Sequence, residues 1–225
     1  MIFWEAPSDN KRLPPTHAAR APENTARIAS CVGNFERYTN PARLMVEANW
    51  IIEEVETPGL ADSDLADIRR LMDDAFGDRF SEEDWSHALG GTHFVVRGGG
   101  DTIVSHAAVV DRRIEVSGDP LSTGYVEAVA THPRFQRKGL ATAVMSAVAE
   151  FIAGRYRMGA LSTSLEFYER LGWIRWRGQT WCREGGELFR TADDDGGVWI
   201  LPTRSSPRLD LESDIVVEWR GGDVW

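Results

Sequence analysis

Residues 124–141 read Gly-Tyr-Val-Glu-Ala-Val-Ala-Thr-His-Pro-Arg-Phe-Gln-Arg-Lys-Gly-Leu-Ala, and they are the most informative stretch of this 225-residue chain. Apolar and β-branched residues dominate 125–131, which predicts a central strand. A short loop follows, and an apolar helical stripe begins at Leu140 and Ala141. Because backbone N–H groups at a helix N-terminus bind phosphate, the loop over 136–139 is a candidate phosphate site.

Composition restricts the class of partner. A net charge of −10 argues against nucleic acid, and an acidic cleft would concentrate cations, although an acidic surface also serves solubility alone. The two cysteines, Cys31 and Cys182, are far apart, which fits a reducing cytoplasm. No apolar run approaches the roughly 18 residues of a membrane span. The scattered histidines predict no metal site.

The N-terminal 44 residues differ from the rest. They hold five of the ten prolines and carry a charge of +2, whereas the remainder carries −12. No helical or strand period runs through them, which predicts a flexible leader over 1–44 and a folded domain over 45–225. Met45 is an alternative translation start, and mass spectrometry of the native protein would distinguish the two.

Hydrophobic patterning beyond the leader predicts alternating strands and helices. Ser63 is a candidate helix cap, and 81–84 resembles a capping box. The run 98–101 is typical of a hairpin turn, and 183–197 reads as a polar loop. The pattern predicts a mixed α/β sheet with helices on both faces, built from strands at 51–55, 93–97, 102–110, 113–116, 125–131, 160–163, 173–176, 198–201 and 215–219.

The order Q-x-x-G-x-A at 136–141, after a strand that contains Glu127, resembles the acetyl-CoA site of the GNAT acetyltransferase superfamily. The resemblance implies the GNAT fold, with a mostly antiparallel sheet, and acetyl-CoA as cosubstrate. It also implies a set of coenzyme-binding residues: Val129, Thr131, Gln136, Arg137, Lys138, Gly139, Leu140 and Ala141.

Two side chains are candidates for proton transfer. Glu127 lies among apolar neighbours, where desolvation should raise its pKa toward the range of a general base. Tyr168 matches the superfamily's F-Y-x-x-x-G-aromatic segment, which implies a general acid for the coenzyme thiolate, while Phe167 is expected to be the packing residue. The N–H of Val129 is the expected oxyanion donor. Neither cysteine sits in a motif, so we expect direct transfer without an acyl-enzyme.

The C-terminal half resembles the aminoglycoside 2′-N-acetyltransferases more closely, through Gly-Tyr-Val-Glu at 124–127, the Asp-Asp-Asp-Gly at 193–196 and the terminal Gly-Asp-Val-Trp. The resemblance covers about 55–225 and implies acetylation of a polycationic antibiotic, hence resistance. The implied acceptor-site residues are Arg79, Asp84, Glu127, Ser162, Asp194, Asp223 and Trp225.

One position departs from that family. Arg79 stands where the family has a substrate-binding aspartate. An arginine pairs with a carboxylate, so we expect kasugamycin, an aminoglycoside that carries a carboxylate, as the favoured substrate.

Two other functions remain open. The chain is alternatively a protein or small-amine N-acetyltransferase, or a non-catalytic CoA-binding module, although Glu127 and Tyr168 together argue against the module. The family resemblance also implies a homodimer. The net charge and the lack of a long apolar run predict no nucleic-acid or membrane partner.

Overall fold

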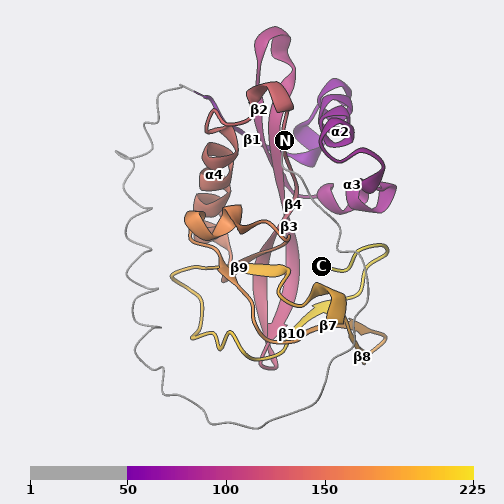
Figure 1. The fold of residues 1–225 in the computed structure, drawn as a ribbon, viewed down its shortest axis with the longest axis vertical. Helices are drawn as coiled ribbons and strands as arrows, with labels where there is room; N and C mark the ends of the chain where they lie inside the picture. Colours follow the sequence, from indigo (N-terminus) through magenta and orange to yellow (C-terminus); the bar gives the residue numbers. More distant parts are fainter. Residues whose placement is uncertain (1–49) are drawn as a thin grey trace, which may run out of the picture. The chain divides into compact units, whose positions relative to one another are not determined.

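The computed structural model describes residues 50–225, drawn in colour in Figure 1. The predicted leader over 1–44, and with it the question of Met45, lies outside the described residues. None of the helices in the described part is long and apolar enough to cross a bilayer.

A curled, mixed β-sheet organises this part of the chain. Its strands follow the order β6-β9-β5-β4-β3-β10-β7-β8, and β2 pairs with both β1 and β3. Among the strands of residues 50–225, only β4–β5 and β10–β7 are parallel pairs. The strands are β1 (Glu53–Glu56), β2 (Thr92–Arg97), β3 (Ile103–Val116), β4 (Asp119–Thr131), β5 (Met158–Ser162), β6 (Ile174–Arg175), β7 (Thr180–Glu184), β8 (Glu187–Arg190), β9 (Val198–Pro202) and β10 (Ile215–Glu218).

Helices cover both faces of the sheet, as the sequence predicts. Figure 1 shows α4 (Leu140–Arg155) on one side of the long strands, with α2 (Asp62–Phe76) and α3 (Glu82–Ala88) on the other. Successive side chains of β2 point to opposite faces of the sheet, so they pack against different helices. Phe94 and Val96 pack with Val144 of α4, whereas Val95 packs with Ile68 of α2. The predicted mixed α/β class is therefore confirmed.

Strand β3 corrects one prediction. The sequence predicts two strands, at 102–110 and 113–116, but β3 is continuous because Asp111, Arg112 and Arg113 keep their pairing with β4. The other edge of β3 is shared. It pairs with β2 as far as Val109 and with β10 from Ile114 onward, so no strand of the described residues 50–225 pairs with 110–113 on that edge.

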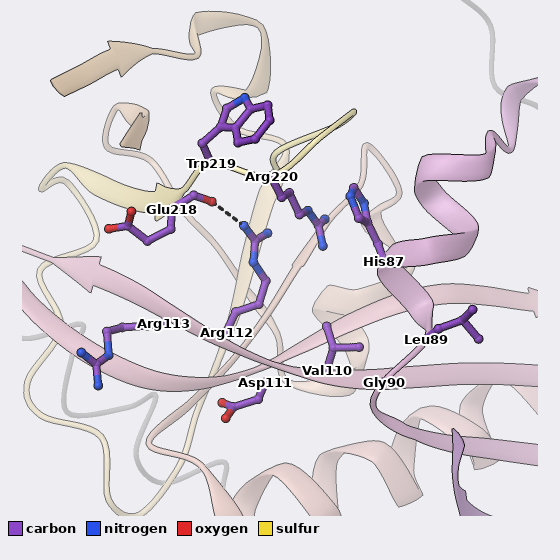
Figure 2. A pocket seen from close by; sticks show the side chains of 10 residues that line it. All are labelled: His87, Leu89, Gly90, Val110, Asp111, Arg112, Arg113, Glu218, Trp219 and Arg220. Atoms are coloured by element: carbon purple, nitrogen blue, oxygen red, sulfur yellow. Dashed lines mark hydrogen bonds between the residues drawn. The ribbon is translucent and has the colours of Figure 1, made fainter. Parts of the chain in front are cut away.

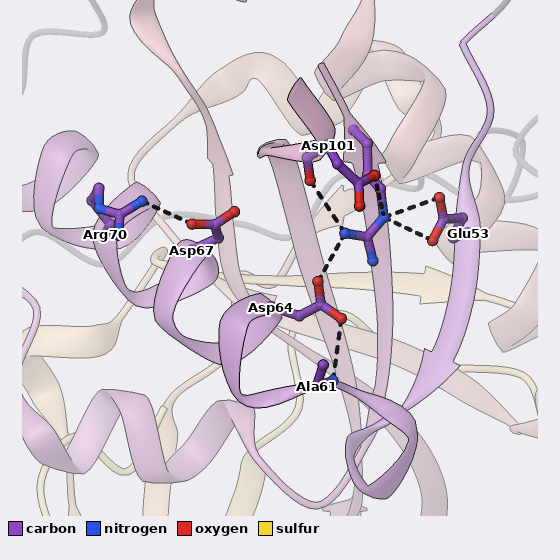
Figure 3. A network of polar contacts seen from close by, with 7 residues as sticks. Glu53, Ala61, Asp64, Asp67, Arg70 and Asp101 are labelled. Carbon is purple, nitrogen blue, oxygen red and sulfur yellow. Dashed lines mark hydrogen bonds and ion pairs between the residues drawn. The ribbon is translucent and has the colours of Figure 1, made fainter. Parts of the chain in front are cut away.

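Of the two predicted helix starts, the cap at Ser63 is wrong and the capping box at 81–84 is correct. The N-cap of α2 is Ala61 rather than Ser63, because the carboxylate of Asp64 accepts the Ala61 N–H at 3.2 Å. The same carboxylate group accepts from Arg97 of β2, which also donates to Glu53 of β1, so one guanidinium connects α2 to two strands. Figure 3 shows Asp64 and Glu53 directed toward a shared guanidinium. The capping box at 81–84 is confirmed, and it starts α3.

The predicted polar loop over 183–197 is wrong in its first half. β7 and β8 form a hairpin there, and Gly185 and Gly186 both adopt positive φ in the turn between them. Glycine takes such angles without a Cβ clash, so this pair reads better as a hairpin turn than as a loop. Only the part near the 3₁₀ turn η8 (Ala192–Asp194) remains irregular.

Candidate active site

The two parallel strands at the middle of the sheet separate where the predicted site begins. β4 and β5 pair only from Thr123 to Tyr125, yet β4 runs on to Thr131 and β5 to Ser162. Within residues 50–225, no strand therefore pairs with β4 beyond Tyr125 on the β5 side. Backbone groups along this edge can bind an extended ligand.

A β-bulge lies in β4 at this opening. Glu127 stands opposite Ala108 and Ala130 opposite His106, so the single residue Ala107 faces two residues on β4. Ala128, the first of the two, has a φ of 51°. Positive φ is uncommon for alanine, and bulges redirect the side chains beside them.

Glu127 carries a largely buried carboxylate. Its Oε1 lies 2.7 Å from Nη1 of Arg220, and the two side chains are 16% and 17% exposed. Burial raises the pKa of Glu127, in the direction predicted from the sequence, while the positive charges of Arg220 and Arg112 oppose the rise. Such a carboxylate is suited to accept a proton near neutral pH.

Tyr168 lies in the 3₁₀ helix η7 (Glu166–Leu171) and is only 6% exposed. Its ring contacts Phe167 and Trp173 edge-on. Phe167 is only partly buried, so the prediction that Phe167 rather than Tyr168 takes the packing role is wrong. Burial raises the pKa of Tyr168, and the hydroxyl is therefore protonated at neutral pH.

The loop between β4 and α4 has the geometry of an anion cradle. Arg137 and Gly139 both adopt positive φ, at 60° and 83°, and Gly139 is the N-cap of α4. The side-chain amide of Gln136 donates to the Thr131 carbonyl at 3.1 Å, which anchors the loop to the end of β4. The first N–H groups of α4, from Leu140 and Ala141 onward, have no acceptor within the helix. These features fit a nucleotide diphosphate, and the exposed Arg137 and Lys138 add positive charge.

The predicted acceptor-site acids fall into two groups. Asp84 accepts the Ser81 N–H at 2.9 Å as part of the cap of α3, and its charge still acts on Glu127. Burial and the nearby charge of Asp223 raise the pKa of Asp194. Ser162 ends β5 near Asp194. The Asp194 carbonyl oxygen and Ser162 Oγ lie 3.2 Å and 3.7 Å from the position that a Cβ on Gly197 would occupy.

The two remaining predicted residues are placed differently. Arg79 is exposed in η4 (Gly77–Arg79), where its Nε donates to the Phe76 carbonyl at 3.3 Å. The indole of Trp225 is buried in the core, and its Nε1 donates to Thr191 Oγ1 at 3.0 Å. Trp225 therefore anchors the chain end, and its ring is not a free surface for a ligand.

Arginines missed by the sequence analysis hold the C-terminal segment, residues 219–225, against the sheet. Arg112 donates to the Val224 carbonyl at 2.7 Å and to the Glu218 carbonyl at 2.9 Å. A ring nitrogen of His87 lies 2.8 Å from the Gly221 carbonyl oxygen. In the sequence, the charged run 111–113, which contains Arg112, was the feature that could have indicated this contact.

A cavity of about 440 Å³ lies at the break between β2 and β10 along β3. Figure 2 shows Arg112 directed toward the Glu218 carbonyl and Arg220 beside His87, while Asp111 and Arg113 lie on the other side of β3. The cavity reaches the same C-terminal segment that carries Arg220 to Glu127.

Comparison with known proteins assigns the family. The sequence model described as "Acetyltransferase (GNAT) domain" matches residues 58–175. The chain belongs to the GNAT acetyltransferase family. This acetyltransferase is 41% identical to the aminoglycoside 2'-N-acetyltransferase of Mycolicibacterium fortuitum over 177 aligned residues. The alignment covers 76% of this chain and 90% of the relative.

A solved GNAT structure has the same fold. The GNAT family N-acetyltransferase YhbS of Escherichia coli, solved in complex with CoA, superposes with a TM-score of 0.53 at 14% identity. The match covers 76% of this chain and 89% of YhbS. The predicted GNAT fold is thereby confirmed.

Proposed function

We propose that this acetyltransferase transfers the acetyl group of acetyl-CoA to the 2′-amino group of an aminoglycoside, which would confer resistance to the antibiotic. The observation that carries the proposal is the 41% identity to a relative named for that activity. The buried Glu127 supports it, because transfer to an amine requires a group that removes a proton.

Acetyl-CoA would be held at the opening between β4 and β5. The loop 136–139 and the first turn of α4, including Leu140 and Ala141, would bind the diphosphate. The backbone of Val129 would face the arm of the coenzyme. The carbonyl of Thr131 already accepts from Gln136, so we propose that Thr131 both anchors the loop and contacts the coenzyme.

The proton transfers follow from the two buried groups. Acetyl-CoA supplies a thioester whose carbonyl carbon is attacked by the amine. Glu127 accepts the proton that the amine loses, directly or through one water. The N–H of Val129 donates to the acetyl oxygen as charge develops there. Tyr168, protonated at neutral pH, donates its proton to the departing thiolate, so the protons gained and lost balance.

A cationic substrate suits the acids near Glu127. Asp194 and Asp223 repel one another, and the binding of an ammonium group between them would relieve the repulsion. Arg79 is exposed and carries no ion pair within residues 50–225, so it is available to a substrate carboxylate. On this ground we favour kasugamycin among the aminoglycosides.

The alternative substrates are a peptide or another small amine. A thiol-release assay across an aminoglycoside panel, with the acetylated position fixed by NMR, tests the proposal. Tobramycin and kasugamycin should release thiol and be acetylated at the 2′ position. Kanamycin A, which carries a hydroxyl at that position, is the matched control and should not react. Turnover of peptides or polyamines with no aminoglycoside reaction would contradict the proposal.

A further inference from the structure

Two histidines form a buried hydrogen-bonded chain that ends at the bulge of β4. His93 on β2 and His106 on β3 are both 0% exposed. Nδ1 of His93 lies 2.9 Å from Nε2 of His106, and Nδ1 of His106 lies 2.8 Å from the carbonyl oxygen of Ala128. At the far end, Nε2 of His93 lies 2.8 Å from Oγ1 of Thr57, which accepts the Gly90 N–H at 2.9 Å.

The Ala128 carbonyl oxygen, at the end of this series of hydrogen bonds, sets the direction of each of them. A carbonyl oxygen only accepts, so His106 must carry its proton on Nδ1. Burial lowers the pKa of His106 to about 3 and that of His93 to about 4, so both rings are neutral at pH 7. Nε2 of His106 therefore accepts from Nδ1–H of His93. Nε2 of His93 in turn accepts from the Thr57 hydroxyl, for which the Gly91 carbonyl at 3.1 Å is a competing acceptor.

The carbonyl at the end of this chain belongs to the strained residue of the bulge. Ala128 has a φ of 51° and lies between Glu127 and Val129. The Ala128 carbonyl and the Val129 N–H belong to one planar peptide group, so a rotation of that group would move the N–H proposed as oxyanion donor. A change in the φ of Ala128 would also redirect this group relative to Glu127, the proposed base. A misplacement of catalytic groups by about 1 Å can cost roughly 100-fold in rate.

We propose that His106 is a positioning residue for acetyl transfer: its ring holds the Ala128 carbonyl and with it the bulge that orients Glu127 and the Val129 N–H. His93 and Thr57 fix the tautomer that this bond requires. The inference depends on the proposed roles of Glu127 and Val129. The hydrogen bond between His106 and the Ala128 carbonyl does not depend on those roles.

A matched pair of variants separates positioning from packing. In His106→Asn the side-chain amide lies near the place of Nδ1 and keeps a donor for the Ala128 carbonyl. In His106→Gln the amide lies near the place of Nε2 and keeps the contact with His93 instead. Both variants leave one buried polar partner unmet, so we expect similar losses in thermal unfolding temperature. We expect kcat to fall about 10- to 100-fold in His106→Gln and about 3-fold or less in His106→Asn, with the KM of the amine nearly unchanged.

Two further readouts keep the outcomes distinct. Calorimetry with acetyl-CoA should show binding by both variants, and NMR of the wild type should show a slowly exchanging His106 Nδ1–H coupled across the hydrogen bond to Ala128. Equal kcat losses in the two variants, or a His106→Gln enzyme as fast as the wild type, would overturn the inference. A wild type that acetylates no aminoglycoside would overturn the proposed function. In that case a crystal structure of His106→Gln that retains the Ala128 φ would overturn the inference, and loss of the bulge would support it.

Discussion

Arg220 brings its guanidinium within 2.7 Å of the Glu127 carboxylate, although the two residues lie on the C-terminal segment and on β4. Burial alone would favour the protonated acid, and the positive charge opposes it. The pair therefore limits the rise in the pKa of Glu127, and the C-terminal segment takes part in setting the protonation of the proposed base.

Removal of that charge should shift the pH dependence of the reaction. Arg220→Gln raises the pKa of Glu127, so the acidic limb of kcat/KM should move to higher pH and activity should return as the pH rises. Arg220→Lys keeps the charge and should leave the limb nearer that of the wild type. A pH–rate profile measures both variants. An acidic limb unmoved in Arg220→Gln would show that Arg220 does not control the base.

The cradle of α4 should depend on glycine at its N-cap. Gly139 has a φ of 83°, which costs roughly 1–2 kcal/mol for alanine. Gly139→Ala should therefore weaken acetyl-CoA binding about 10-fold, as measured by calorimetry. Gly154→Ala, in the same helix and with open space around it, is the control and should leave binding unchanged. Equal affinity in the two variants would argue against a diphosphate at Gly139.

The two buried histidines should make stability depend on pH. Their folded pKa values lie below the ordinary 6.5, so the unfolded chain binds more protons and stability falls as the pH drops below 6.5 toward about 4. From pH 7 to 5.5 the free energy of unfolding should decrease by about 2 kcal/mol. Urea titrations measure it, and His106→Asn should reduce the pH slope by about half. A slope identical in that variant would contradict the assignment.

Substrate choice provides the test of Arg79. The wild type should prefer kasugamycin to tobramycin in kcat/KM, because the exposed guanidinium is available to the carboxylate of kasugamycin. Arg79→Asp should reverse the preference, and Arg79→Lys should weaken it less. A wild type that prefers tobramycin would reject the kasugamycin assignment while leaving the 2′ regiochemistry standing.

The sequence predicted the parts of the fold that depend on local patterns. The capping box at 81–84, the α4 stripe and the hairpin at 98–101 follow from spacing alone, and all three are present. Contacts across the chain were not accessible in this way. Nothing local marks Arg220 as the partner of Glu127 or connects His93 to His106. The first pair depends on where the C-terminal segment lies, and the second depends on the register of β2 against β3.

Two long-range contacts show the same limit. The ring of Trp225 is buried and donates to Thr191, a residue 34 positions earlier, which no local pattern indicates, while the place of Trp225 in the acceptor site stays a prediction. Residues 111 and 112 were expected to separate two strands, whereas long-range pairing with β4 keeps β3 continuous. In both cases tertiary contacts decided what local polarity could not.

Steady-state kinetics of Glu127→Gln beside the wild type test the central claim most directly. The substitution keeps the volume of the side chain and removes its capacity to accept a proton. Turnover of a 2′-amino aminoglycoside should fall by about 10²- to 10⁴-fold, while calorimetry shows acetyl-CoA bound as in the wild type. A variant that binds acetyl-CoA and retains nearly full turnover would contradict the account.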